Sequence, residues 1–441
     1  MWLNVDTDHW SITLPNQAPW IEFAQAITAA RQYIRQHGGQ TWLLQHAERE
    51  AFSVWLMALL CERKSPLLPS NGQPDTLAQL TPLADQVTPA QWPAAAQTPT
   101  QWPYTLSGAL NDELVLFTSG SSGTPKAVPK TLRQLFAEIR TLEHTFGAVI
   151  GPSLITTTVT HQHIYGLIFT VIWPLCAGRL VHHERFEYPE QWHAFHQRNT
   201  APYVLVSSPA QLERFSQVTP LHGLDSQLAA VFSSGGPLHE QVPSSFLAAG
   251  IAPPFEVFGS TETGGIAWRK RQEPTTPFTL FSGVLADTDN AKTLRIRSPH
   301  LATSNWYETS DNVTFVGANT FLMQGRADRT VKLAEKRVSL DDMEAYTECL
   351  DWVGKAKCCI VTGINRQELG LAVQLNAKGQ EQLRTQGKFA LRQTLRQHLA
   401  QRFEPVVLPR KFRYLDSLPY NDAGKITQAA LLQLFAEDTQ S

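Results

Sequence analysis

The chain has 441 residues, which is enough for two or three domains with a large core. Its formal net charge is −2 and 17% of its residues are charged, so no basic excess points to nucleic acid or to an anionic membrane as a partner. The 5 cysteines are scattered without C-x-x-C spacing, which fits reduced thiols in a cytoplasmic protein and neither a disulfide framework nor a zinc site. The longest apolar stretch, 164–177, is too short to span a bilayer, and residues 1–20 lack the apolar core of a signal peptide.

The first part of the chain predicts two helices, at 21–37 and 48–63. Residues 64–112 are rich in Pro, Gln, Thr and Ala, and we expect an irregular surface segment there. From 113 to 265 strands alternate with helices, which favours sheets with helices packed on their faces. We expect strands at 113–117, 154–159, 203–207, 229–232, 255–258, 293–297, 313–316 and 321–324, and a helix capped by Thr131.

The segment from about residue 330 onward predicts a small α+β domain. It should contain helices after Leu340 and at 388–402, and strands at 357–361, 369–375 and 411–415. The short polar stretch 326–329 suits a hinge. We therefore predict an N-terminal domain over 1–325 and a C-terminal domain over 330–441.

The stretch that follows the predicted strand at 113–117 is the most informative part of the chain. It combines Thr118, Ser119, Gly120, Ser121, Ser122, Gly123, Thr124 and Lys126. Gly120 and Gly123 let the backbone turn with its N–H groups inward, the hydroxyls donate further hydrogen bonds, and Lys126 adds a cation. Such a loop between a strand and a helix suits the oxygens of a polyphosphate, although a Ser/Gly-rich surface turn remains the alternative. The G-x-x-G-x-x-K spacing is not that of a Walker A loop, which argues against a P-loop NTPase or kinase.

The sequence T-S-G-S-S-G-T-P-K resembles the phosphate loop of the adenylate-forming (AMP-binding) superfamily, which includes acyl-CoA synthetases, aryl-CoA ligases, adenylation domains and luciferases. Four further motifs match in the family's order, so the resemblance covers nearly the whole chain. It implies an α/β fold with a large N-terminal domain of helix-covered sheets and a small β-structured part, followed by a mobile α+β C-terminal domain. The family usually has more residues before the phosphate loop, so the N-terminal subdomain looks trimmed.

A polar turn follows the predicted strand at 255–258 and resembles the family's Y-G-x-T-E motif. It reads Phe258-Gly259-Ser260-Thr261-Glu262-Thr263-Gly264-Gly265. The resemblance implies that Phe258 stacks on adenine beside Gly259, that Thr261 donates to the α-phosphate and that Glu262 coordinates Mg²⁺. Phe in place of Tyr keeps the stacking face, and a carboxylate is a hard ligand suited to Mg²⁺. Without the other motifs, any strand-end loop would explain this turn equally well.

Two more motifs resemble the walls of the nucleotide site. The adenine-side loop of the family matches Ser234, Gly235 and Gly236, for which a tight turn is the alternative. Tyr307-Glu308-Thr309-Ser310-Asp311 resembles Y-x-T-G-D, which implies that Asp311 accepts from the ribose hydroxyls. Arg326 resembles the arginine near the ribose, and Asp328 matches the hinge position, where backbone torsions absorb a domain rotation. A surface Asp and a solvated linker are the alternatives for these residues.

The acid pocket and the catalytic lysine are assigned by the same resemblance. His163 matches the H-x-x-G element beside the acid, with Gly264 and Gly265, although a buried structural histidine is nearly as good an explanation and His161 could confuse the register. Lys425 lies in a loop that resembles the C-terminal catalytic loop. A carboxylate and an α-phosphate repel each other, and one cation that bridges them lowers the barrier.

These motifs lead us to expect an ATP-dependent acid ligase that uses Mg²⁺ and forms an acyl-AMP from an aromatic or fatty acid. CoA or carrier-protein phosphopantetheine would then take the acyl group, which leaves an acyl carrier protein open as a partner. Glu335 stands where the family's hinge-following loop has glycine, and its bulk and charge put the thiol acceptor in doubt. The alternative is an adenylate-binding relative that stops at acyl-AMP or has lost catalysis.

Overall fold

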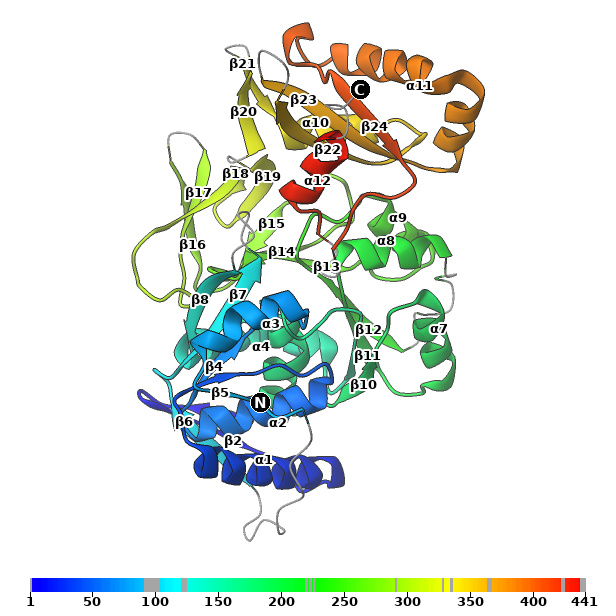
Figure 1. Ribbon diagram of the computed structural model, residues 1–441. Helices are drawn as coiled ribbons and strands as arrows, with labels where there is room; N and C mark the ends of the chain where they lie inside the picture. The colour runs from blue at the N-terminus through cyan, green and yellow to red at the C-terminus, as the bar shows by residue number, and fades with distance from the viewer. Residues whose placement is uncertain are drawn as a thin grey trace. The chain divides into compact units, whose positions relative to one another are not determined.

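The computed structural model describes residues 2–90, 104–119, 125–218, 221, 224, 227–289, 292–326, 329–333, 336–362, 367–421 and 425–436. The chain divides into two compact units (Figure 1). The first comprises Met1–Ala286 and Ile296–Tyr307, and the second comprises Asp287–Arg295 and Glu308–Ser441. The border between these units falls at Tyr307, and the hinge expected at 326–329 stays a prediction because 327–328 lie outside the described residues.

The first unit contains a five-stranded sheet in the order β5-β3-β4-β7-β8. Its strands are β3 (Thr41–Leu43), β4 (Ser65–Leu68), β5 (Gln86–Val87), β7 (Glu113–Ser119) and β8 (Pro125–Thr131). The first four run parallel and β8 runs antiparallel to β7. The expectation of an irregular segment over 64–112 was wrong for β4, for α3 (Pro74–Leu80), for β5 and for β6 (Thr105–Ala109). Pro66, Leu67 and Leu68 form a short apolar run that is buried inside the sheet.

Strand β8 corrects the predicted order of strand, loop and helix. The glycine loop joins β7 to β8 in a hairpin, and α4 (Leu132–Ile150) begins only after β8. Pro125 and Pro129 conceal this strand in the sequence because proline cannot donate to a ladder, but β8 lies at the sheet edge, where proline is tolerated. Thr131 caps α4 as predicted, in a capping box with Gln134.

The second sheet of the first unit carries most of the candidate site. Its strands lie in the order β10 (Val181–Arg185), β9 (Leu154–Thr157), β11 (Tyr203–Ser207), β12 (Leu228–Ser233), β13 (Phe255–Ser260), β14 (Gly264–Lys270) and β15 (Phe278–Leu280). The strands from β10 to β13 are parallel, so the residues that follow β9, β12 and β13 meet at one edge of the sheet. This is the edge at which ligands bind in open α/β sheets.

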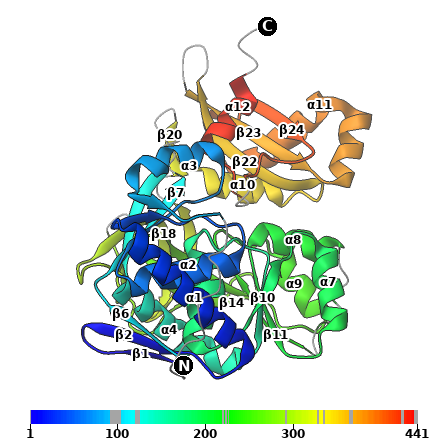
Figure 2. The ribbon, with the colours of Figure 1, turned by 60° about the horizontal axis from the view of Figure 1, so that its bottom comes forward.

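Helices cover the sheets of the first unit as the alternation predicted. Helices α7 (Pro189–Arg198), α8 (Pro209–Val218) and α9 (Gln241–Ala248) pack on β11 and β12 (Figures 1 and 2). Helix α4 contacts β8 of one sheet and β12 and β14 of the other, which explains why polar side chains on α4 are buried. The predicted helices at the start of the chain are confirmed as α1 (Ala18–His37) and α2 (Arg49–Cys61), which pack against each other. A small sheet of β1 (Leu3–Val5), β2 (His9–Thr13) and β6 (Thr105–Ala109) contacts α2 through β6. The short helices α5 (Ile164–Leu167) and α6 (Trp173–Ala177) follow β9.

The second unit contains most of a meander, a hairpin and an α+β part. The meander has the order β19 (Thr320–Arg326), β18 (Tyr307–Gly317), β17 (Thr293–Arg297) and β16 (Leu285–Thr288), and the hairpin joins β20 (Thr330–Leu333) to β21 (Lys336–Ser339). The α+β part contains β22 (Val353–Thr362), β23 (Gln367–Leu375) and β24 (Lys411–Leu415), with helices α10 (Leu340–Glu348), α11 (Ala377–Ala400) and α12 (Gln428–Ala436). The expected α+β character of this part is therefore confirmed.

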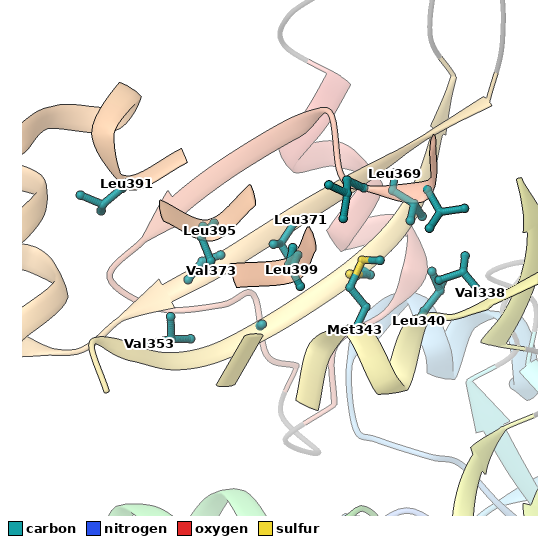
Figure 3. Packing of buried hydrophobic residues seen from close by; sticks show 14 of the residues in the cluster. Val338, Leu340, Met343, Val353, Leu369, Leu371, Val373, Leu391, Leu395 and Leu399 are labelled. Atoms are coloured by element: carbon teal, nitrogen blue, oxygen red, sulfur yellow. The ribbon is translucent and has the colours of Figure 1, made fainter. Parts of the chain in front are cut away.

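Helices hold the three-stranded sheet of the second unit from both faces. In Figure 3, Leu391, Leu395 and Leu399 of α11 lie over β23. Successive strand residues point to opposite faces, so the buried neighbours Cys358 and Cys359 belong to two different clusters, the second of which includes Phe435 of α12. These two cysteines therefore pack β22 against helices on both of its faces.

The described helices were also compared with the length and hydropathy that a bilayer requires. None of them is long and apolar enough to cross a membrane.

Candidate functional site

The backbone of the turn after β13 can form only with a glycine at position 259. A Cβ on Gly259 would overlap the carbonyl oxygen of Gly264, so the close approach of these two strands needs glycine. The N–H of Ser260 donates to Thr263 Oγ1 at 3.0 Å, and the N–H of Thr263 donates to Ser260 Oγ at 3.2 Å. These reciprocal bonds close the turn and leave Thr261 and Glu262 partly exposed at its tip.

An ion pair joins this turn to the predicted phosphate loop. Lys126 Nζ lies 2.6 Å from Glu262 Oε1, with side-chain exposures of 60% and 28%. This hydrogen bond and the charge of Glu262 raise the pKa of Lys126. Burial opposes ionisation of Glu262, but the hydrogen bond and charge of Lys126 lower its pKa overall. The fold thus brings together a cation and a carboxylate that lie 136 residues apart in the chain.

Part of the phosphate loop lies outside the described residues. Gly120, Ser121, Ser122, Gly123 and Thr124 belong to this part, as does the side chain of Ser119, so their roles stay predictions. Thr118 lies directly across the hairpin from Lys126, at the mouth of the loop.

The predicted adenine side is built around Phe258. Ser234 Oγ donates to the carbonyl oxygen of Val257 at 2.8 Å, which ties the 233–236 loop to the strand that carries Phe258. The φ of Gly235 is 92°, a left-handed conformation that favours glycine, and Gly236 beside it is exposed. The Phe258 ring lies 5.8 Å from the ring of Phe278, which sequence reasoning did not single out. A half-buried aromatic face beside a tethered glycine loop can accept a planar group.

A buried polar cluster supports the turn from behind, and sequence reasoning missed it. Its members are Lys130, Gln134, Glu138, Thr141 and His300, each less than 10% exposed. The N–H of Gly265 donates to Glu138 Oε1 at 2.8 Å, and a Cβ on Gly264, whose φ is 67°, would crowd the same carboxylate. Gly264 and Gly265 therefore join the turn to α4. The charged and polar residues spaced along 130–141 were the sequence signal for this cluster.

The two histidines after β9 have different environments. His163 precedes α5, is partly buried, and its carbonyl oxygen accepts from the N–H of Leu167 at 2.8 Å. His161 is buried, lies 3.0 Å through Nε2 from the carbonyl oxygen of His46, and burial lowers its pKa to about 4. A Cβ on Gly166 would overlap the carbonyl oxygen of Thr160, so the H-x-x-G spacing has a packing reason here. His161 is thus a buried histidine with a structural partner, and the role of His163 at the acid pocket, like its structural alternative, stays a prediction.

The predicted ribose residues lie together in the second unit. Asp311 on β18 and Arg326 on β19 occupy directly opposed positions of the antiparallel ladder. Arg326 Nη1 lies 3.6 Å from Asp311 Oδ1, and the carboxylate is 15% exposed. The N–H of Asp311 donates to Thr309 Oγ1 at 3.1 Å, which fixes the backbone at this position. The pair presents two acceptor oxygens beside a guanidinium.

Lys425 lies in a segment that closes on itself. Its N–H donates to Asn421 Oδ1 at 2.8 Å, and the N–H of Asn421 donates to the carbonyl oxygen of Lys425 at 2.8 Å. An isolated bridge between Tyr420 and Ile426 completes the closure, and the side chain of Lys425 is exposed. The turn residues 422–424, like Asp328 and Glu335, lie outside the described residues.

A preformed metal centre was sought among the described residues. Within the ranges that the structure covers, no group of three or more His, Cys, Asp and Glu side chains could hold a metal ion.

Several curated proteins and solved structures are similar to this chain. A 4-coumarate–CoA ligase of Rhodobacter capsulatus is 27% identical over 244 residues, which cover 54% of this chain and 57% of that protein. The phenyloxazoline synthase MbtB of Mycobacterium tuberculosis is 30% identical over 135 residues, which cover 31% of this chain and 9% of that protein. The chain thus spans little more than half of the first protein and a small part of the second.

The structural similarity extends over nearly the whole chain. The ATP-bound RpMatB–BxBclM chimera has a TM-score of 0.78 and 17% identity and covers 95% of this chain and 94% of its own. A benzoate CoA ligase of Burkholderia xenovorans has a TM-score of 0.73 and 18% identity, with 94% of both chains covered. These matches confirm the predicted fold. A model of the AMP-binding enzyme family matches residues 58–288, which is more than half of the sequence, and the chain therefore belongs to that family.

Proposed function

We propose that the protein is an ATP-dependent carboxylic acid ligase. It activates an aromatic or fatty acid as an acyl-AMP, releases pyrophosphate, and transfers the acyl group to the thiol of CoA or of carrier-protein phosphopantetheine. The observation that supports this most strongly is the pairing of Lys126 with Glu262 in a chain that belongs to the AMP-binding enzyme family. In this pair, Lys126 is a cation suited to phosphate oxygens and Glu262 is a carboxylate suited to Mg²⁺, and the two side chains are in contact.

In the first step, a carboxylate oxygen attacks the α-phosphorus of ATP and the bond from that phosphorus to pyrophosphate breaks. Positioning and charge stabilisation provide most of the catalysis in such a transfer. Phe258 stacks on adenine, Thr261 donates to the α-phosphate, and Lys126 with the rest of the 118–126 loop binds the β- and γ-phosphates. His163 lies beside the acid.

Mg²⁺ fits the residues of the turn, because a single carboxylate together with substrate phosphates is a common arrangement for this ion. Glu262 would hold it, and the ion would supply neutralisation of phosphate charge. Lys126 lowers the pKa of the Glu262 carboxylate, which favours the ionised form that a metal ligand needs. ATP would draw Lys126 toward phosphate oxygens as Glu262 turns to the metal.

The second unit supplies the remaining groups in this proposal. Asp311 and Arg326 bind the ribose, and Lys425 stabilises the charge that develops as carboxylate and α-phosphate approach. The domain over 330–441 rotates about Asp328 relative to the domain over 1–325. A thiolate then attacks the acyl carbon, the bond from that carbon to the AMP oxygen breaks, and AMP leaves.

A second candidate is a relative that makes acyl-AMP only or has lost catalysis. Glu335 favours it, since the side chain adds bulk and charge to the loop that resembles the family's thiolation loop. The second candidate differs from the first in that it either does not transfer the acyl group to a thiol or does not form acyl-AMP at all. Both can be tested in one experiment.

The test incubates the full chain with ATP, Mg²⁺ and a panel of aromatic and fatty acids and measures acyl-AMP, AMP and pyrophosphate by mass spectrometry. At least one acid should give acyl-AMP, and adding CoA or a phosphopantetheinylated carrier protein should convert it to a thioester. Lys425→Ala should slow acyl-AMP formation at least a hundredfold, by about 3 kcal/mol, whereas Lys388→Ala, which removes an exposed lysine of α11, should not. Absence of acid-dependent pyrophosphate release with every acid would refute the proposal.

A further inference from the structure

Lys130 is an unusual lysine because it lies on an edge strand and yet is only 3% exposed. Burial lowers the pKa of its ammonium, while the charges of Glu138 and Glu262 act in the opposite direction. Removing an ammonium from water is costly, and a chain that keeps one in this position gains something from its hydrogen bonds. The partners of Lys130 indicate what that is.

The ammonium of Lys130 holds the backbone of the residue that is expected to bind the metal. Lys130 Nζ donates to the carbonyl oxygen of Glu262 at 2.6 Å. Lys126, four residues earlier on the same face of β8, holds the Glu262 side chain at 2.6 Å. One strand thus fixes Glu262 at both its main chain and its carboxylate.

Lys130 also connects the turn to a second loop. It lies 3.4 Å from the carbonyl oxygen of His300, which in addition accepts from Gln134 Nε2 at 3.1 Å. His300 Nδ1 lies 2.9 Å from the carbonyl oxygen of Gly265, at the other end of the turn, and Glu138 accepts from the N–H of Gly265. The two ends of the 262–265 segment are therefore anchored to β8, α4 and the His300 loop by one buried cluster.

We propose that Lys130 is a positioning residue for Glu262. It sets the direction of the Glu262 side chain by fixing the peptide group that follows it, and it does so without touching the substrate. This inference rests on the proposed function for its consequence, since a fixed Glu262 matters only if Glu262 holds Mg²⁺ with the nucleotide. Hydrogen-bonding partners that orient a metal ligand typically change metal affinity by roughly 10- to 100-fold.

The test compares Lys130→Met with the wild-type protein. Methionine keeps the apolar stem and removes all the donors of the ammonium. The control is Arg179→Met, which removes another buried cation that donates to a main-chain carbonyl, that of Gly151, and to the Glu143 carboxylate, away from the turn. Two readouts are used: amide hydrogen exchange of peptides that cover 260–265, and the Mg²⁺ concentration at which binding of α,β-methylene-ATP, which cannot release pyrophosphate, is half-maximal.

In Lys130→Met, the amides of 260–265 should exchange about tenfold faster than in the wild type, and half-maximal nucleotide binding should require roughly tenfold more Mg²⁺. Arg179→Met should match the wild type in both measurements. Exchange in Lys130→Met at the wild-type rate would overturn the inference, whatever the reaction of the protein. If the wild type bound no nucleotide, the proposed function would fail while the exchange result still decided the anchoring role. Should Lys130→Met not fold, Lys130→Leu, which keeps part of the apolar stem and has no donor, replaces it with the same expected and contrary results.

Discussion

The buried histidine beside the predicted acid pocket gives a pH dependence that can be worked out from the structure. Burial lowers the pKa of His161 from 6.5 to about 4. Below pH 6.5 the unfolded chain takes up a proton at this position that the folded protein does not, so stability is complete above pH 6.5 and is lost as pH falls toward 4. A pH of 5 is 1.5 units below the pKa of the unfolded histidine, which is then protonated, whereas the histidine in the folded protein is still mostly neutral. The loss is then about 2 kcal/mol, at roughly 1.4 kcal/mol per unit.

The assay is urea unfolding at pH 7.5 and pH 5.0, followed by tryptophan fluorescence. All of the 12 tryptophans except Trp352 fall within the residue ranges of the first unit, so the signal reports on the unit that contains His161. In His161→Gln, the amide can still donate to the carbonyl oxygen of His46 but cannot take up a proton. Other buried histidines, such as His300, change the unfolding free energy with pH by the same amount in the wild type and in the variant.

The reasoning predicts that the drop in unfolding free energy between the two pH values is about 2 kcal/mol smaller in His161→Gln than in the wild type. His183→Gln, which changes a histidine whose side chain is 74% exposed, should show the wild-type drop. An equal drop in all three proteins would refute the argument that burial holds His161 neutral.

Three further changes test other parts of the account. Glu262→Gln should leave the free energy of unfolding in urea within about 0.5 kcal/mol of the wild type, because its ion pair with Lys126 is partly exposed. It should nevertheless lower the rate of acyl-AMP formation at least a hundredfold, and unchanged kinetics would contradict the metal role. Phe258→Leu should raise the KM for ATP roughly three- to tenfold with little change in kcat, and an unchanged KM would argue against stacking on adenine. Gly166→Ala should destabilise the first unit by about 3 kcal/mol in the urea assay, because the methyl group would overlap the carbonyl oxygen of Thr160, and a neutral result would contradict that packing.

Local patterns in the sequence predicted most of the fold. The strands at 203–207 and 411–415 match β11 and β24 residue for residue, because each is a short run bounded by polar or proline residues. Strand β8 was missed because its two prolines and three polar residues hide a pattern that only the sheet edge permits. The extent of α11 was also underestimated, since two helices meet at Gly387, whose φ of 80° breaks the helical backbone.

The motifs of the candidate site could be predicted from the sequence, but the buried polar cluster that anchors the 262–265 turn could not. Phe258 to Gly265 and Thr118 to Lys126 form contiguous stretches whose composition is informative by itself. Lys130, by contrast, reaches partners that lie 132 and 170 residues away in the chain, and an alternating polar stretch on a strand edge looks solvated in the sequence. Only the burial of α4 between two sheets turns these polar residues into an internal cluster.

The central claim, that a carboxylate oxygen attacks the α-phosphorus of ATP, can be tested by following an isotope. The acid that the protein activates is labelled with ¹⁸O in its carboxylate, and the nucleotide product is analysed by mass spectrometry after transfer to the thiol. The account predicts AMP that carries one ¹⁸O atom, because the oxygen that joined carbon to phosphorus leaves with the phosphate. Unlabelled AMP, or ADP formed together with ¹⁸O-labelled inorganic phosphate, would contradict it.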